Sequence, residues 1–476
     1  MKRRILSIIL LTMMGLMLFA PASVNAAEVS SQKDIVVDSY AIPDLVYGDT
    51  YGIYPLTWYA KGLTKPVTIS NLEVLFAGLR NKILDSGEVI HTKDVLPDVK
   101  EAMTVEEVIH AYGIILSNYK YTKDIYDISP DYSVEFMKKQ GVYTGKNGEQ
   151  GLKEKCSLEQ AMVMATRIVT YVYHSLDAAS KGFLWQVNAG NNTVYLLGSI
   201  HVASHSIYPF GQAILEAYQS AQALVVEADI YNQREMAAYS RLAVYTDQTT
   251  LKDHIPADLY QKTIEICTKL GISESIAAYM KPWYLSFVFG NYAIAGKDES
   301  DELVANLGID ISFLNDAHTN QKPILEIEGL SQQAKIIDGF SGGLQEYLLA
   351  DSIHAVNLLL GESTSPDMTD QNDLTDRMLA CWHDGNVDAF RMMTRTGGTG
   401  KDNETAAFDE TMQYLKEYQD KLIHQRDVGM ADYIDKLLNT QTPHTFFVVV
   451  GAGHFISDYS VLDILKEKGY EITQIK

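Results

Sequence analysis

The chain has 476 residues, of which 46% are apolar and 21% are charged, an ordinary composition for a globular protein. This length predicts two or three domains with an ample core. The formal net charge is −22, and such an acidic surface argues against binding nucleic acid or anionic lipid through long-range attraction.

Residues 1–26 have the features of a secretory signal peptide. A basic segment at 2–4 precedes an apolar run over 5–20, and small residues at 24–26 offer a cleavage site. The apolar run is short for a membrane span, and no later segment reaches spanning length. We therefore expect an extracytoplasmic protein, secreted or at the cell surface, with no transmembrane span after signal cleavage.

Three helix starts of one kind lie between residues 27 and 179. At Ser70, Thr104 and Ser157, Glu or Gln follows three positions later and an apolar stripe comes next. This pattern is the capping box, and it predicts a mainly helical accessory domain. The third start resembles the end of a surface-layer homology repeat, which implies binding to cell-wall polymer. The alternative is a helical domain without that role.

A β-hairpin is predicted where the character of the chain changes, near residue 183. Apolar runs at 183–187 and 193–197 flank five turn-forming residues, and the second run leads directly into Gly198-Ser-Ile-His201. A helix and another buried strand follow, and this strand ends in Glu227 and Asp229. A right-handed crossover places both strand ends at one sheet edge, so we expect His201 and these carboxylates to converge.

The same pattern recurs near the end of the chain, where the apolar run 446–450 leads into Gly451-Ala-Gly-His454. Ligands of open α/β sheets bind outside the carboxyl ends of strands, so His201 and His454 are expected at one site. Between the two patterns the chain is mainly helical, apart from a short strand at 323–328. The predicted fold is α/β, a mixed sheet core with flanking helices and a large helical insertion.

Two imidazoles with one or two carboxylates form a ligand set suited to zinc, manganese, cobalt or iron. Three protein ligands leave a position for water, and hydrolysis at neutral pH follows. His205 is expected at the rim of such a site, because Gly198 and Pro209 indicate a loop. Arg426 has two open interpretations, orienting a site carboxylate or forming a surface ion pair.

Several other chemistries lack their sequence patterns. The chain has no His-Glu-x-x-His, no Gly-x-Ser-x-Gly and no phosphate-binding glycine loop. Its three cysteines form no Cys-x-x-Cys pair, which argues against a thiolate zinc cluster. Zincins, serine hydrolases and nucleotide-dependent enzymes are therefore disfavoured.

From about residue 183 to 476 the chain resembles the TraB/PrgY/GumN family, which includes the Tiki metalloproteases. The resemblance implies a fold related to erythromycin esterase and ChaN-like proteins. It also implies His201, Glu227 and His454 as metal ligands or catalytic residues, with Glu328 and Arg426 as further site residues. Tiki members are manganese- or cobalt-dependent proteases, and other members regulate a peptide pheromone. Asp427 stands where the family usually has asparagine. The matching segments are Leu197-Gly-Ser-Ile-His-Val202, Tyr208-Pro, Val225-Val-Glu-Ala-Asp229, Lys281-Pro-Trp283, Gly308-Ile-Asp310, Lys322-Pro, Glu328, Gln333, Trp382, Gly385-Asn, Arg426, Val449-Val-Gly-Ala-Gly-His-Phe455 and Gly469-Tyr.

These observations predict an accessory domain over 27–179 and a catalytic domain over 180–476. The predicted function is an exported hydrolase acting on peptides or proteins, with a divalent metal (Mn, Co or Zn) held by His201, Glu227 and His454. Asp229 or Glu328 would act as general base. The alternative is a non-catalytic cell-surface protein that binds or sequesters a peptide or a metal.

Overall fold

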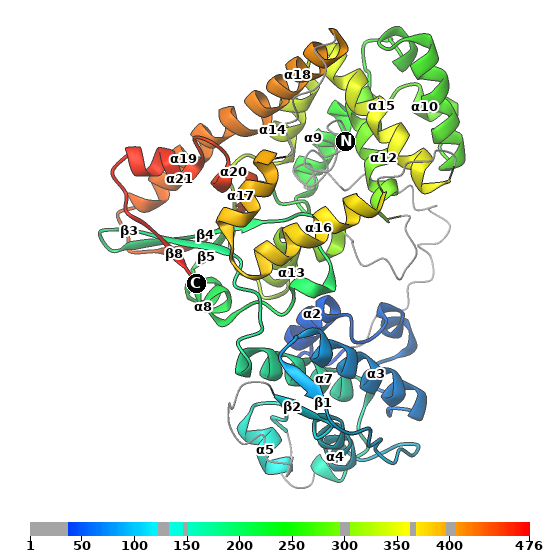
Figure 1. The fold of residues 1–476 in the computed structure, drawn as a ribbon, viewed down its shortest axis with the longest axis vertical. Helices are drawn as coiled ribbons and strands as arrows, with labels where there is room; N and C mark the ends of the chain where they lie inside the picture. The colour runs from blue at the N-terminus through cyan, green and yellow to red at the C-terminus, as the bar shows by residue number, and fades with distance from the viewer. Residues whose placement is uncertain (1–36, 122–132, 146–150, 296–304, 362–367, 397–405) are drawn as a thin grey trace. The chain divides into compact units, whose positions relative to one another are not determined.

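The structure is a computed structural model that describes residues 37–121, 133–145, 151–295, 305–361, 368–396 and 406–476 (Figure 1). The predicted signal peptide lies outside the described residues. The described residues form two compact units: 37–181 with His205–Leu215, and Gly182–Ser204 with Glu216–Lys476. Across the described ranges, no helix combines the length and apolarity needed to cross a membrane.

The first unit is mainly helical. Capping boxes open α4 at Thr104 and α7 at Ser157, as predicted. The prediction for Ser70 was wrong, because Thr68 caps α3 with Asn71 reaching back to it, and Ser70 lies inside the helix. Binding of this unit to cell-wall polymer stays a prediction. Its elements are α2 Ile42–Tyr51, the 3₁₀ helix Leu56–Lys61, α3 Ile69–Asp85, β1 Val89–His91, α4 Val105–Leu116, β2 Tyr119–Tyr121, α5 Val134–Lys139 and α7 Leu158–Ser175.

The second unit is built on a six-stranded mixed sheet of order β6-β5-β7-β4-β3-β8. Strands β4, β7, β5 and β6 are parallel neighbours, whereas β3 pairs antiparallel with both β4 and β8. The predicted hairpin and the mixed α/β fold are thereby confirmed. The strands are β3 Phe183–Ala189, β4 Asn192–Ser199, β5 Ala223–Val226, β6 Ile324–Glu326, β7 Thr445–Gly451 and β8 Ile472–Ile475.

The last long strand, β7, lies in the middle of the sheet between β4 and β5. Its register pairs Ser199 of β4 with Gly451, and Val226 of β5 with Val449. Because the three strands are parallel, their carboxyl ends lie at one edge, where ligands bind in open α/β sheets. Both Gly-x-x-His segments and the segment after β5 leave the sheet from this edge.

Helices surround the sheet, as predicted (Figure 1). A buried apolar cluster that includes Cys267, Phe289 and Leu349 holds α10, α12 and α15 together within the helical insertion. The helices are α8 Gln212–Ser220, α9 Gln233–Leu242, α10 Ala257–Lys269, α11 Glu274–Ala277, α12 Pro282–Ala295, α13 Ile309–Thr319, α14 Leu330–Asp338, α15 Gly342–Leu359, α16 Met368–His383, α17 Val387–Thr396, α18 Ala406–Gln419, α19 Gln425–Leu438, α20 Gly453–Ile456 and α21 Val461–Glu467.

A π-helical turn, Asp420–His424, joins α18 to α19. Helix α19 then runs from Gln425 to Leu438 without a break. Such single π turns occur often at functional sites, because they shift the face of the helix on which the next side chains lie. Arg426 and Asp427 follow shortly after this turn, and both are buried.

Candidate functional site

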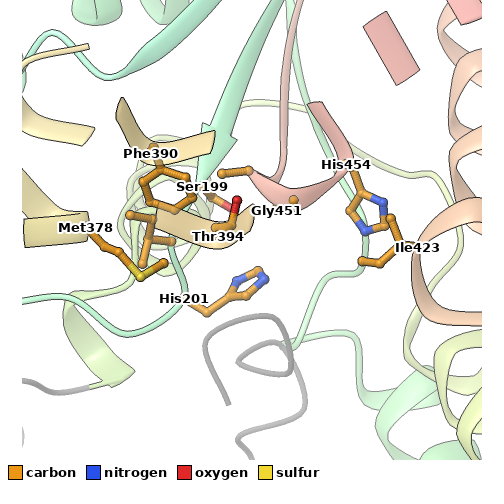
Figure 2. Close-up of a pocket in the computed structure, with 11 residues that line it drawn as sticks. Ser199, His201, Met378, Phe390, Thr394, Ile423, Gly451 and His454 are labelled. Carbon is orange, nitrogen blue, oxygen red and sulfur yellow. The ribbon is translucent and has the colours of Figure 1, made fainter. Parts of the chain in front are cut away.

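Gly451, the last residue of β7, lies where the three predicted metal ligands meet. A Cβ atom added to it would lie 3.3 Å from His201 Nε2, 3.3 Å from Glu227 Oε1 and 3.7 Å from His454 Cδ2. All three side chains are buried, with at most 3% of their surface exposed. Figure 2 shows the two imidazoles on either side of an open space next to Gly451.

His201 is held by the start of α13. The Ile309 N–H donates to the carbonyl oxygen of Ile200 at 3.1 Å. A Cβ atom on Gly308 would lie only 2.4 Å from the His201 carbonyl oxygen, so glycine permits this close approach. The docked turn places Asp310 Oδ2 3.1 Å from His201 Nδ1. This contact is an ion pair only when His201 is protonated, and the Asp310 carboxylate has no hydrogen-bond donor among the described residues.

His454 lies in the single turn α20, directly after β7, and is held by α19. Its Nδ1 is 2.6 Å from Oδ1 of Asp427, which is fully buried. The Ser457 hydroxyl donates to the other oxygen of Asp427 at 3.4 Å. A carboxylate at Nδ1 fixes the imidazole tautomer and leaves Nε2 available. Both histidines therefore have a buried carboxylate at Nδ1.

Glu227 follows β5 and lies in a dense polar network. Its Oε1 accepts from the Gly451 N–H at 2.7 Å, and its Oε2 accepts from Gln333 Nε2 at 3.0 Å. The Arg426 guanidinium also donates to Oε2. Arg426 donates in addition to both oxygens of Glu328, at 2.8–3.0 Å. Arg426 thus joins two carboxylates, and it is 7% exposed.

The charges of this network shift several pKa values. Burial alone would raise the pKa of Glu227, but Arg426, His454 and His201 outweigh it and lower that pKa to about 2. Burial opposes protonation of His201, but the carboxylates of Asp310 and Glu227 outweigh it and raise its pKa. Glu227 is therefore ionised at neutral pH.

Two other predicted residues lie in different surroundings. Asp229 faces His318, whose Nε2 is 3.0 Å from each carboxylate oxygen. His205 belongs to the helical unit, where its Nδ1 forms a hydrogen bond with the carbonyl oxygen of Thr50 at 2.9 Å. The structure therefore brings His201, Glu227, His454, Glu328 and Arg426 together, but Asp229 pairs elsewhere.

The donor set fits a first-row divalent metal in its chemistry. Each imidazole has a carboxylate at Nδ1, the arrangement that orients metal-binding histidines. Glu227 Oε1 and His201 Nε2 both lie 3.3 Å from the position that a Cβ atom on Gly451 would occupy. Even so, the described part of the chain holds no group of three or more His, Cys, Asp or Glu side chains close enough to hold an ion. The Glu227 carboxylate is bound within the protein by Arg426, Gln333 and the Gly451 N–H.

A pocket opens beside the two histidines. Besides His201, Gly451 and His454, it is lined by Ser199, Ile200, Met378, Phe390, Thr394, Ile423, Ala452 and Gly453 (Figure 2). Most of these side chains are apolar, and three of them come from α16 and α17. The pocket therefore combines a polar end at the histidines with an apolar wall.

The roles of the residues that orient the site were not predicted from the sequence. Asp310 and Gln333 were noted in matching segments, and Asp427 as a departure from the family, but nothing in their spacing indicated contacts with His201, Glu227 or His454. The apolar wall was also missed. Residues more than 170 positions from His201, such as Met378 and Phe390, reach the pocket only through the packing of α16 and α17.

Comparisons with known proteins agree with the resemblance noted in the sequence. Over 314 residues the chain is 25% identical to Metalloprotease TIKI1 of Danio rerio, covering 61% of this chain and 62% of that protein. It is 23% identical to a Metalloprotease TIKI homolog of Nematostella vectensis, over 62% of this chain and 67% of the relative. The Escherichia coli (strain K12) protein YbaP, described as uncharacterized, is 26% identical over 58% of this chain and 89% of its own length.

The matched region spans only about 60–67% of the length of the TIKI relatives. No solved structure matches the chain. The model of the TraB/PrgY/gumN family matches residues 183–474, which include both Gly-x-x-His segments, Glu227, Glu328 and Arg426. The chain therefore belongs to the TraB/PrgY/gumN family.

Proposed function

We propose that this protein is an exported metal-dependent hydrolase that cleaves peptides or proteins, with His201, Glu227 and His454 as the metal ligands. The observation that carries the proposal is the convergence of these side chains around Gly451, from segments far apart in the sequence. The name metalloprotease, given to the TIKI relatives, supports the same reaction class. When bound, a divalent metal (Mn, Co or Zn) supplies Lewis-acid activation of a carbonyl and of water.

The residues around the ligands have separate tasks in this proposal. Asp310 and Asp427 hold the Nδ1 atoms, so that both imidazoles present Nε2 to the shared space. Arg426 keeps Glu227 ionised and in place. Of the two carboxylates predicted as general base, Glu328 shares Arg426 with Glu227, whereas Asp229 pairs with His318. We therefore assign the general base to Glu328.

The test begins with metal analysis of the protein purified without affinity metals. We expect about one divalent ion per chain, and cleavage of peptides that chelators abolish. Both properties should disappear in His201→Ala and His454→Ala variants that keep the wild-type circular dichroism spectrum. His444→Ala, which changes a histidine outside the pocket lining, is the matched control. Metal bound with wild-type affinity by both site variants would refute the ligand assignment.

One observation favours a second candidate, a non-catalytic binder of a peptide or a metal. Both oxygens of the Glu227 carboxylate already accept hydrogen bonds, from Arg426, Gln333 and the Gly451 N–H. A binder would hold peptides tightly without turnover in the presence of Mn²⁺, Co²⁺ or Zn²⁺. Product formation with any of these ions would exclude it.

Export rests on residues 1–26, whose basic, apolar and small-residue segments follow the order of a signal peptide. We therefore place the protein outside the cytoplasm, secreted or at the cell surface. Fractionation of cells that express the full chain tests this location. Mature protein that begins near residue 27 is expected in the extracytoplasmic fraction, and an uncleaved chain in the cytoplasm would contradict it.

A further inference from the structure

Much of the pocket lining is apolar. Five side chains without polar atoms line it, and each is at most 6% exposed. They come from four parts of the chain: the end of β4, the α16–α17 pair, the π turn and the turn after β7. These side chains are Ile200, Met378, Phe390, Ile423 and Ala452.

The α16–α17 pair is fixed firmly over the end of β4. Trp382 of α16 is fully buried, and its indole N–H donates to the Gly198 carbonyl oxygen at 2.7 Å. The ring of Phe390 packs edge-on against Phe183 of β3, with 5.1 Å between centroids. Arg391 donates to the carbonyl oxygen of Ile456 at 3.0 Å. The apolar wall is therefore a built surface whose position relative to His201 and His454 is fixed by the sheet.

The polar side chains of the pocket carry no fixed charge. No Asp, Glu, Lys or Arg is among its lining residues in the described ranges. Ser199 is 3% exposed, and its Oγ has no hydrogen-bond partner among the described residues. A buried hydroxyl without a partner costs free energy, so this atom suits a hydrogen bond with the polar main chain of a ligand.

We propose that this pocket is a specificity site that binds one uncharged, apolar side chain of the peptide, next to the bond that is cleaved. The inference rests on the proposed function and names its substrate class. The apolar side chain packs against Met378, Phe390 and Ile423, and the Ser199 hydroxyl bonds to the adjacent main chain. A charged side chain would lose its hydration against a lining that has no Asp, Glu, Lys or Arg in the described ranges, which is strongly unfavourable.

The first measurement is the cleavage profile of the full chain with Mn²⁺, Co²⁺ or Zn²⁺ on peptides that differ at one position. Products are identified by mass spectrometry. We expect kcat/KM to be about 10- to 100-fold higher with Leu, Ile, Met or Phe at one position beside the cleaved bond than with Asp, Glu, Lys or Arg. Equal cleavage whatever the side chain would overturn the specificity site while leaving the hydrolase in place.

The second measurement tests peptide binding to the pocket in the absence of catalysis. Peptides that contain Leu, Glu or Lys at the chosen position are titrated into the wild-type protein in EDTA, and binding is followed by calorimetry. At least tenfold tighter binding of the Leu peptide is expected, and equal affinities would overturn the inference. Failure of peptide cleavage with every metal would instead refute the proposed hydrolase, while this titration still decides the pocket.

Two variants on α17 test whether the pocket is the source of the preference for an apolar side chain. Thr394→Glu places a carboxylate in the pocket lining, and it should raise affinity for the Lys peptide relative to the Leu peptide by at least tenfold. Met392→Glu is the matched control, because Met392 lies on the same helix, is 64% exposed and is not a lining residue. It should leave the preference unchanged. The same shift in both variants would mean that net charge, rather than the pocket, sets the preference.

Discussion

Replacing Gly451 with alanine is the sharpest perturbation of the site. The φ angle of Gly451 is outside the left-handed region, so alanine can adopt the same backbone. The added methyl carbon would lie 3.3 Å from both His201 Nε2 and Glu227 Oε1. This contact is tight but tolerable for the fold, and it fills the space that the predicted ligands share.

The size of the effect follows from these distances. Metal–ligand bonds to imidazole nitrogen and carboxylate oxygen are about 2.0–2.2 Å long, so an ion bonded to both atoms competes with the methyl group for the same space. Forcing an extra methyl group into a packed site costs about 1–3 kcal/mol. If that cost falls on the metal-bound form, metal affinity drops by about 5- to 150-fold.

The assay is calorimetric titration of metal-free protein with Mn²⁺, Co²⁺ and Zn²⁺. Gly429→Ala is the control, because Gly429 lies within α19 and an added Cβ would meet nothing within 4 Å. This control should bind metal normally and gain about 0.5–1 kcal/mol of stability from the helical alanine. A folded Gly451→Ala variant with wild-type affinity for all three ions would refute a metal site next to Gly451.

Three further predictions concern other parts of the molecule. Asp427→Ala should weaken metal binding by about 10- to 100-fold. Asp427→Asn should weaken it less, because asparagine still offers an oxygen to His454. Equal effects of the two variants in calorimetry would contradict the role of Asp427 in orienting His454. Trp382→Phe should lower the free energy of unfolding in urea by about 1–3 kcal/mol, because the Gly198 carbonyl loses its buried donor; a change below about 0.5 kcal/mol would show that the bond is unimportant. Burial raises the pKa of Asp49 to about 6 despite the hydrogen bond from Tyr59. Ionisation of Asp49 therefore lowers the stability of the folded state as pH rises from about 4 to 6. Asp49→Asn removes this cost, so it should raise the Tm at pH 8 but not near pH 4. A gain in Tm of equal size at both pH values would count against this assignment.

Local patterns in the sequence predicted the sheet elements that lead to the site. The runs before His201 and His454 fold as β4 and β7, and the run before Glu227 folds as β5. Short apolar runs that end in turn-forming residues specify buried strands without help from distant residues. The ends of these strands converge because the strands pair in parallel. The sequence predicts this parallel pairing but does not fix the register between the strands.

The parts that escaped prediction depend on contacts between distant segments. Asp310 reaches His201 because Gly308 lets α13 approach the backbone after β4, and Asp427 reaches His454 because a π turn precedes it. Neither contact has a periodic signal. The start of α3 at Thr68 was missed for a different reason, because an asparagine replaces the usual Glu or Gln of a capping box.

The central position of β7 affects the order in which the parts of the sheet can fold. This strand pairs with β4 residues that precede it by about 250 positions, and it also separates β4 from β5. Pairings between such distant segments form slowly, because a long loop must close first. A chain that is still emerging from a ribosome or an export channel contains His201 and Glu227, but it lacks the strand that joins them and the second histidine. The site is therefore assembled only after the chain has been synthesised through β7 and His454.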